Sequence, residues 1–424
     1  MLPIVQGAST SAEGLIIIEQ SSTGKRQKVS HGENRQEPLA PLASRPPARH
    51  LGLMLVALAA LALVGQAVTA LLVWFNHRHT PPLGRAVELS EAPGLLCVVP
   101  ARNEEQNIVP CVESLAASRY PGRLRIRVVD DGSTDRTAVL VRALAERSAG
   151  VELVAADAPP PGWLGKNHAL FVGTRGAEEP WLLFVDADTR VAPDCLARAM
   201  GAALDRRADL LTMIPRIEAL SFWERAVQPM IAGLIVASLP ARDVNDPGKR
   251  AAAGIGPFML FRRAAYERIG GHQAVRGEVV EDLALAEAVK KNGLQLSLVR
   301  GIELASLRMY DSLGAIVRGW SKNFHIALGP VPWTAPLVAA LLLIVFAGPY
   351  LLPILAVAKS ECAATWVGIG AALVALAGRF DLARRYGVTA RSPWLAPLGA
   401  VVVALILLRS VLPMAVQWKG RAVR

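Results

Sequence analysis

The segment from Leu51 to Phe75 contains 25 consecutive residues without a charged side chain. An α-helix needs about 20 predominantly apolar residues to cross the hydrocarbon core of a bilayer. A buried helix of a water-soluble domain seldom stays uncharged over this length, so we expect residues 51–75 to form a transmembrane helix. Residues 1–50 are rich in polar residues and proline, and we expect them to form a disordered N-terminal tail.

Apolar character returns in the C-terminal part of the chain. The three segments concerned are 334–358, 363–378 and 393–408. They predict a C-terminal transmembrane region over 334–418 with about three spans. Arg409 interrupts the last segment, and a third full crossing would carry the basic C-terminus to the far side of the membrane. The positive-inside rule therefore leaves open that the last segment is re-entrant or interfacial.

The distribution of charge favours a membrane partner over nucleic acid. The chain has 46 Lys and Arg against 35 Asp and Glu, a net charge of +11. Residues 359–424 hold nine basic and two acidic residues, interspersed with apolar segments. This arrangement is typical of anchoring beside anionic lipid headgroups, whereas a nucleic-acid-binding protein concentrates its basic residues on a polar domain. The four cysteines are widely separated, which argues against a zinc site or a disulfide framework and indicates a reducing compartment.

Between the apolar segments, residues 93–311 alternate short apolar runs with helical patterns. The runs predict strands near 95–99, 125–129, 151–154, 181–185 and 209–214. The intervening stretches predict helices near 104–118, 134–147, 166–176 and 193–204. A connector over 221–250 precedes a further strand at 257–261 and a helix that begins at Glu281. This alternation predicts an α/β domain with a mostly parallel sheet and helices on both faces.

Polar motifs follow the strands, where open α/β sheets bind their ligands. The three motifs are Pro100-Ala101-Arg102-Asn103-Glu104, Asp130-Asp131-Gly132-Ser133-Thr134 and Asp186-Ala187-Asp188. Capping by Asn103, Ser133 or Thr134 would explain part of the pattern, and Asp-x-Asp could be a solvated turn. Capping does not explain the adjacent carboxylates of Asp130 and Asp131, which repel each other unless something binds there. The carboxylates of Asp186 and Asp188 suit Mg²⁺ or Mn²⁺ held together with a substrate diphosphate.

Two helix N-termini carry further candidate residues. Lys166 begins a helix, where the lysine and free backbone amides would bind an anion, although an exposed surface lysine is the alternative. Glu281 and Asp282 open another helix, where they would either stabilise the helix dipole or supply a general base. The sequence Gly254-Ile255-Gly256 upstream would let a ligand approach the backbone closely.

Residues 312–330 predict an interfacial amphipathic helix. Leu313, Ile316, Trp320 and Phe324 recur at helical spacing. Three basic residues nearby could instead neutralise a diphosphate leaving group, namely Arg308, Arg318 and Lys322. His168 and His272 lack the spacing of a metal site, and we expect them to be structural or exposed.

Taken in order, these motifs resemble family 2 glycosyltransferases of the GT-A fold over roughly residues 93–300. The matching positions include Val98 to Glu104, Asp130 to Ser133, Asp186 to Asp188, Gly254 to Gly256 and Glu281-Asp282. The resemblance implies that Pro100, Ala101, Arg102, Asn103, Glu104, Asp130 and Asp131 hold the nucleotide, with Lys166 and Asp186 as further nucleotide-sugar contacts. It implies that Asp186 and Asp188 position Mg²⁺ or Mn²⁺, and that Asp282 is the general base with Glu281 beside it. A single displacement would invert the anomeric configuration.

The membrane layout resembles the subgroup that glycosylates carotenoids or related isoprenoid lipids. Arg308-Met309-Tyr310, Gly319 to Asn323 and Trp418 to Arg421 also resemble that subgroup. The implied partners are a nucleoside diphosphate sugar, with a UDP-sugar expected, a lipid acceptor and the membrane. The implied location is the inner cell membrane, as a multi-pass protein with a cytoplasmic catalytic domain. The alternatives are a polyprenyl-phosphate glycosyltransferase, a processive polysaccharide synthase and a non-catalytic scaffold, but the Gln-x-x-Arg-Trp motif of processive synthases is absent from the sequence.

Overall fold

The computed structural model describes residues 47–84, 91–328, 334–387, 393–412, 416–418 and 421–423. The expected tail over 1–50 therefore lies outside the described residues except at its last positions, and so does the end of the expected interfacial helix at 329–330. Lys419 and Gly420 of the C-terminal motif also lie outside them.

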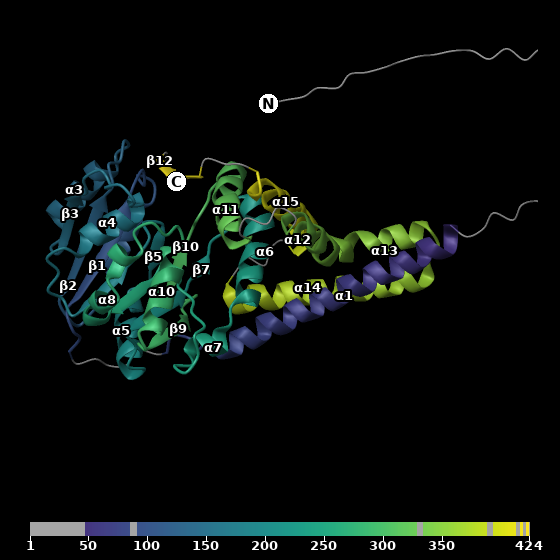
Figure 1. Cartoon of the computed structure of the whole chain (residues 1–424), viewed down its shortest axis with the longest axis horizontal. Coiled ribbons are helices and arrows are strands. Elements are labelled where there is room, and N and C mark those ends of the chain that lie inside the picture. Colours follow the sequence, from purple (N-terminus) through teal and green to yellow (C-terminus); the bar gives the residue numbers. More distant parts are fainter. Residues whose placement is uncertain are drawn as a thin grey trace, which may run out of the picture. The chain divides into compact units, whose positions relative to one another are not determined.

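A seven-stranded sheet forms the centre of the α/β domain within the described residues (Figure 1). Its strands are β1 (Leu95–Ala101), β2 (Leu124–Asp130), β3 (Val151–Ala155), β4 (Trp181–Phe184), β6 (Leu210–Ile214), β8 (Met259–Arg262) and β9 (Leu296–Arg300). They lie in the order β3-β2-β1-β4-β8-β6-β9. β8 runs antiparallel to both of its neighbours, and the other pairs are parallel. The prediction of a mostly parallel α/β sheet is confirmed.

Helices cover both faces of this sheet. The main ones are α2 (Ile108–Ala116), α3 (Thr137–Arg147), α4 (Gly165–Thr174), α5 (Cys195–Asp205) and α10 (Glu281–Lys291), with the short α8 (Arg263–Arg268) and α9 (Gly271–Ala274). Along β1, Cys97 and Val99 belong to the core beneath α2 and α5, whereas Leu96 and Val98 belong to the core beneath α4 and α10. Successive side chains of a strand point to opposite faces, so a strand buried on both faces is apolar throughout, as β1 is.

The first two helices begin later than their sequence pattern predicts. α2 starts at Ile108 rather than near 104, and α3 starts at Thr137 rather than near 134. Asn103 is not the residue that caps α2, and neither Ser133 nor Thr134 caps α3, because Asn107 and Arg136 occupy those positions. The polar residues ahead of both helices instead form two loops that hydrogen-bond to each other.

A second, three-stranded sheet brings two distant segments together. It consists of β5 (Thr189–Val191), β10 (Ala305–Leu307) and β7 (Arg216–Ile217), in the order β5-β10-β7. Leu307 pairs with Thr189 of β5 and with Ile217 of β7. Residues 308–310, which follow β10, are thereby held near the Asp186–Asp188 turn, which precedes β5.

Four helices among the described residues are long and apolar enough to cross a membrane. The first is α1 (Pro47–His79) and the third is α14 (Cys362–Tyr386). The second is a continuous helix made of α12 (Thr334–Leu342), η1 (Leu343–Ala347) and α13 (Gly348–Ala358). The fourth is made of η2 (Pro393–Leu395) and α15 (Ala396–Ser410). This agrees with the prediction of one N-terminal and about three C-terminal apolar helices. α1 and α14 lie side by side (Figure 1), and the rings of His77 and Tyr386 at their ends are 5.5 Å apart.

The expected connector over 221–250 contains a 17-residue helix, α6 (Phe222–Ser238), followed by α7 (Ala241–Asn245). Ser221 and Glu224 form a capping box at the start of α6. The charges of Glu224 and Arg225 together with Pro229 obscure the apolar character of this segment in the sequence. In the structure Ala226, Val227, Met230 and Ile231 of α6 pack in one core with α15.

The amphipathic segment forms α11 (Leu313–Leu328), with Ile316 and Trp320 buried in the same core as α6 and α15. His325 Nδ1 of α11 lies 2.6 Å from the carbonyl oxygen of Ser410, which ends α15. Near the start of α15, a β-carbon placed on Gly399 would lie 2.2 Å from the carbonyl oxygen of Ala226. α15 therefore lies along α6 and α11, and a residue larger than glycine would not fit at position 399.

Candidate active site

The loops that follow β1 and β2 hold each other by hydrogen bonds. Because the strands are parallel with Ala101 opposite Asp130, the two loops emerge side by side. The Asn103 N–H donates to Ser133 Oγ at 3.0 Å, and the Thr134 N–H donates to Asn103 Oδ1 at 2.8 Å. The Asn103 backbone has a positive φ of 53°, which asparagine tolerates better than most residues. The structure thus brings the predicted nucleotide-binding residues 100–104 and 130–131 into one cluster.

Asp130 and Asp131 have different surroundings within that cluster. The Asp130 carboxylate accepts a hydrogen bond from the Ser133 N–H at 3.2 Å and so organises the turn. The Asp131 side chain is fully buried, and Arg102 lies against it with Nη1 4.0 Å from Oδ2. Arg102 Nη1 also donates to the backbone carbonyl of Asp131. A buried carboxylate next to a guanidinium is held in a fixed position, and it is therefore suited to accept hydrogen bonds from the donor groups of a ligand.

Lys166 lies between two of the predicted acidic positions. Its Nζ is 2.8 Å from Asp186 Oδ1 and 2.7 Å from Glu281 Oε1. Burial lowers the pKa of Lys166, but the carboxylates of Asp186 and Glu281 more than offset this, and the net shift is well upward. Lys166 is therefore a fixed positive charge in the first turn of α4, and not an exposed surface lysine.

Asp282 lies on the other side of the same cluster. Its Oδ2 accepts a hydrogen bond of 2.8 Å from the Gly256 N–H, and its Oδ1 accepts one of 2.8 Å from the Leu283 N–H. The pKa of Asp282 is raised to about 6. Burial is the main cause and the neighbouring Glu281 carboxylate contributes, whereas the charge of Lys166 opposes the rise. A carboxylate of this basicity is deprotonated at neutral pH and takes a proton more readily than an ordinary aspartate.

The glycine segment makes this arrangement possible. A β-carbon placed on Gly254 would lie 2.0 Å from the carbonyl oxygen of Asp282, so only glycine fits there. A β-carbon placed on Gly256 would lie 3.2 Å from Asp282 Oδ2, 3.6 Å from Lys166 Nζ and 3.7 Å from Asp186 Oδ2. Gly256 is thus the point at which the charged groups of β4, α4 and α10 converge.

Asp186 and Asp188 follow β4 and supply hard oxygen donors. The described residues contain no cluster of three or more His, Cys, Asp or Glu with metal-ligand geometry. Two carboxylates without further protein ligands fit a Mg²⁺ or Mn²⁺ ion that takes its remaining ligands from a diphosphate and water. Tyr310 lies close enough to Asp188 for this carboxylate to raise its pKa, although burial is the larger cause of the rise to about 12.

Asn167, which has no role assigned from the sequence, holds the site in place. Asn167 Nδ2 donates to the backbone carbonyls of Val275 at 2.9 Å and Glu278 at 2.8 Å, so it fastens the loop that leads into α10. Lys322 of α11 lies near the cluster: burial lowers its pKa, as does the charge of Lys166, whereas Glu281 and Asp186 oppose this shift. Asn167 follows Lys166 directly in the sequence, but its partners lie more than a hundred residues away, so the sequence gives no sign of its role.

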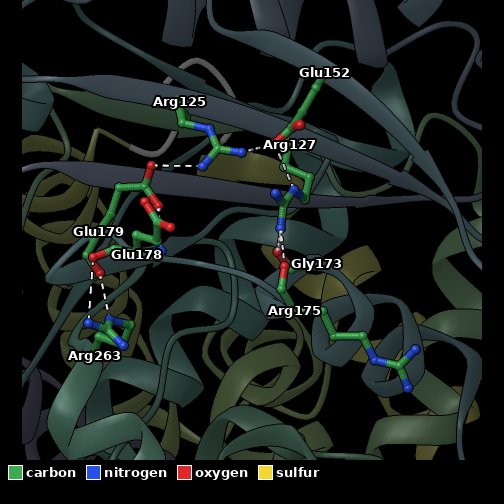
Figure 2. A network of polar contacts seen from close by, with 8 residues as sticks. All are labelled: Arg125, Arg127, Glu152, Gly173, Arg175, Glu178, Glu179 and Arg263. Carbon is green, nitrogen blue, oxygen red and sulfur yellow. Dashed lines mark hydrogen bonds and ion pairs between the residues drawn. The ribbon is translucent and has the colours of Figure 1, made fainter.

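An ion-pair network fixes the other end of α4 to the sheet (Figure 2). Arg127 of β2 donates from Nη1 to the carbonyls of Gly173 and Arg175, both at 2.8 Å, and from Nε to Glu152 at 2.7 Å. Arg125 donates hydrogen bonds to both Glu152 and Glu179. A guanidinium satisfies the free carbonyls at the C-terminus of a helix and complements its dipole. Because α4 starts with Gly165 and Lys166, this network also fixes the position of the Lys166 backbone.

Other residues singled out in the sequence lie elsewhere. Arg308 forms two contacts with the buried Glu224, at 2.8 and 3.2 Å, which ties the segment after β10 to α6 and does not support a role at a diphosphate. His272 is buried against Phe184 and hydrogen-bonds to Tyr266 at 2.8 Å, and burial lowers its pKa to about 3. His168 is buried against Trp163. Both histidines are structural in this arrangement, as expected.

Comparisons with known proteins agree with this geometry. Residues 96–270 match the family model described as glycosyl transferase family 2. A protein of Staphylococcus aureus strain MRSA252 named 4,4'-diaponeurosporenoate glycosyltransferase is 28% identical over 275 residues, which cover 64% of this chain and 70% of that protein. Its counterpart in strain USA300 is 27% identical over 258 residues, covering 60% of this chain and 66% of that protein. The alignments thus span about two thirds of these relatives.

Two solved structures give more distant matches. The mannosyltransferase PcManGT from Pyrobaculum calidifontis in complex with GDP-Man and Mn²⁺ is 20% identical, covers 84% of this chain and 97% of its own, and has a TM-score of 0.46. TarS 1-349 of S. aureus in complex with UDP-GlcNAc is 15% identical and has a TM-score of 0.38, and the match covers 75% of this chain and 90% of that chain. The chain therefore carries a glycosyl transferase family 2 domain over residues 96–270, which includes the Asp186–Asp188 turn and has a GT-A-like α/β fold, and the chain is similar to carotenoid glycosyltransferases.

Proposed function

We propose that the protein is a membrane-bound inverting glycosyltransferase that moves one sugar from a nucleoside diphosphate sugar, with a UDP-sugar expected, to an isoprenoid- or carotenoid-like lipid. The observation that carries this proposal is the convergence of Asp282, Lys166 and Asp186 around Gly256. This cluster holds a carboxylate of raised pKa beside a fixed positive charge. It adjoins the Asp186–Asp188 turn, at the carboxyl ends of the strands, where such sheets bind nucleotides.

The residues of the cluster suit a direct displacement. The acceptor hydroxyl oxygen forms a bond to the anomeric carbon while the bond from that carbon to the diphosphate oxygen breaks, and the electron pair leaves with the diphosphate. Asp282 takes the hydroxyl proton, because its carboxylate is deprotonated at neutral pH and more basic than usual. Attack on the face opposite the leaving group inverts the configuration. Asp186 and Asp188 would hold Mg²⁺ or Mn²⁺, which neutralises charge on the diphosphate when bound.

The names of the relatives suggest a second class of acceptor. The suffix of diaponeurosporenoate denotes a carboxylate. A carboxylic acid has a pKa near 4 and is ionised at neutral pH, so a carboxylate acceptor would attack without losing a proton to a base. An alcohol acceptor requires Asp282 as base, whereas a carboxylate acceptor does not. Replacing Asp282 therefore distinguishes the two acceptors.

The arrangement of the helices suggests how the chain lies in the membrane. α1 ends beside the α/β domain, where Asn245 donates to the carbonyl of His79. The helix 334–358 would then lead away from this domain and α14 would return to it. α15 runs along α6 and α11 and ends beside His325, which supports an interfacial placement. The catalytic domain and Arg384 and Arg385 would then share the cytoplasmic side of the inner membrane, in line with the positive-inside rule.

The test is transfer by the purified full-length chain in nanodiscs, supplied with labelled nucleotide sugars and separate alcohol, carboxylate and polyprenyl-phosphate lipids. We expect a lipid product heavier by one sugar unit, with the anomeric configuration opposite to that of the donor. Asp188→Asn should abolish transfer, and Asp205→Asn, which changes an exposed acid at the end of α5, should not. A polymer would instead indicate a processive synthase, and a product formed only on polyprenyl phosphate would indicate a carrier-loading enzyme.

A further inference from the structure

A cavity of about 480 Å³ lies where two of the apolar helices end against the α/β domain. Its lining includes His77 of α1 and Asp381, Arg384 and Arg385 of α14. Arg198 of α5, Arg300 at the end of β9 and the segment 301–304 that follows it also line the cavity. None of these residues belongs to the candidate active site.

The lining of this cavity carries an excess of positive charge. Four arginines face two acids, Glu303 and Asp381, which leaves a formal excess of two positive charges. One of the arginines, Arg385, pairs with Asp381 at 2.6 Å. A concave site with unbalanced guanidinium groups attracts an anion, and guanidinium is suited to bind phosphate with two parallel hydrogen bonds.

Two of these arginines are held in place by backbone carbonyls. Arg300 Nη1 donates to the carbonyls of His77 at 3.1 Å and Thr80 at 3.0 Å. Arg198 donates to the carbonyls of Gly84 at 2.6 Å and Leu83 at 2.8 Å. A carbonyl is a dipole without net charge, so both guanidinium groups are fixed but keep their full charge. A binding site that is fixed beforehand spends little free energy on ordering its side chains when a ligand arrives.

Arg384 is the most adaptable member of the group. It is exposed on the last turn of α14, and among the described residues it forms no ion pair. Its flexible side chain is therefore able to close over a ligand that Arg198 and Arg300 bind. Both helices are apolar enough to cross a membrane, so in the membrane insertion proposed above the cavity would lie at the depth where the hydrocarbon ends and the headgroups begin.

We propose that this cavity binds the phosphate group of an anionic membrane phospholipid. The headgroup would seat the catalytic domain on the bilayer at the ends of α1 and α14. A phosphate without a lipid has the same charge, but the position of the cavity at the ends of two apolar helices favours the lipid. This inference rests on the membrane insertion proposed above and not on the transfer chemistry.

The experiment measures lipid retention, so its outcome is independent of glycosyl transfer. The full-length chain is purified from mixed micelles of phosphatidylcholine and phosphatidylglycerol, and the lipid bound per protein is counted by native mass spectrometry. We expect the wild type to retain phosphatidylglycerol in preference to phosphatidylcholine. Arg384→Gln should weaken retention about fivefold, the usual effect of one basic residue beside an anionic lipid, and Arg384→Glu should weaken it further.

The matched control is Arg206→Gln, which removes the same charge from an exposed arginine after α5 that does not line the cavity. Its retention should equal that of the wild type. Equal loss in the Arg384 and Arg206 variants would overturn the proposal, because it would show an effect of net charge alone. Displacement of phosphatidylglycerol by an equal concentration of inorganic phosphate would also overturn it in favour of a soluble anion.

Discussion

Lys166 Nζ lies 2.8 Å from Asp186 Oδ1, so the first turn of α4 neutralises the first acid of the Asp-x-Asp turn. The same amino group contacts Glu281 at 2.7 Å, and its charge lowers the pKa of Asp282. One lysine thus links the proposed metal-binding turn to the proposed base. The first two predictions below test Asp282 as the base and the effect of the Lys166 charge on its pKa.

Replacing Asp282 with asparagine should lower the transfer rate to an alcohol acceptor by about 10²–10⁴-fold, because the amide cannot take the hydroxyl proton. Asparagine retains an oxygen that accepts the Gly256 N–H, so nucleotide-sugar binding should persist. Single-turnover transfer by the folded variant in nanodiscs measures the effect. The control variant is Asp205→Asn, which makes the same substitution at an exposed position. A near-normal rate with an alcohol acceptor would remove Asp282 from the role of base.

The pH dependence of kcat/KM should have an acidic limb near pH 6 for an alcohol acceptor. Only the deprotonated Asp282 acts as base, so the rate should rise with pH through its pKa of about 6 and then level off. Lys166→Met removes a positive charge that favours the carboxylate, so the limb should move to higher pH. Glu281→Gln removes a negative charge that disfavours it, so the limb should move to lower pH. Shifts in the same direction for both variants would contradict this electrostatic account.

Transfer should require a divalent cation. Excess chelator should abolish turnover, and Mg²⁺ or Mn²⁺ should restore it, because two carboxylates and a lysine do not by themselves neutralise a departing diphosphate. Asp188→Asn should remain inactive at any cation concentration used for the wild type. Binding of Mn²⁺ in the presence of a nucleoside diphosphate, followed by electron paramagnetic resonance, gives a readout without catalysis. Full turnover in chelator would refute the assignment of Asp186 and Asp188.

Replacing Arg127 with methionine should destabilise the catalytic domain by about 2–4 kcal/mol, because it leaves the Gly173 and Arg175 carbonyls without their buried donor and Glu152 with Arg125 as its remaining partner. The thermal unfolding midpoint of the full chain in detergent should fall accordingly. Arg147→Met is the matched control, because its ion pair with Glu113 is largely exposed and should contribute less than about 1 kcal/mol. Equal midpoints for the two variants would show that the network in Figure 2 does not stabilise α4.

Local patterns in the sequence predicted six of the seven strands of the main sheet and the presence of the apolar helices, but not β9 or the second sheet. These features depend on local patterns: β1 is apolar throughout because it is buried on both faces, and α1 is uncharged over its middle. The acidic motifs Asp130-Asp131 and Asp186 to Asp188 were also visible, because each lies at the end of a strand. Local patterns did not predict the helix α6, because the charges of Glu224 and Arg225 interrupt a segment whose apolar residues pack against α15.

Which of these residues meet depends on the folded arrangement of distant segments. Lys166, Asp186 and Asp282 come from α4, the turn after β4 and α10, and the sheet order places those three elements around Gly256. The role of Asn167 and the pairing of Arg308 with Glu224 likewise depend on contacts between residues at least 84 positions apart. The pKa of Asp282 follows from the burial and neighbouring charges that the fold supplies. Residue type and spacing fix local structure, whereas distances and burial between remote segments exist only once the chain has folded.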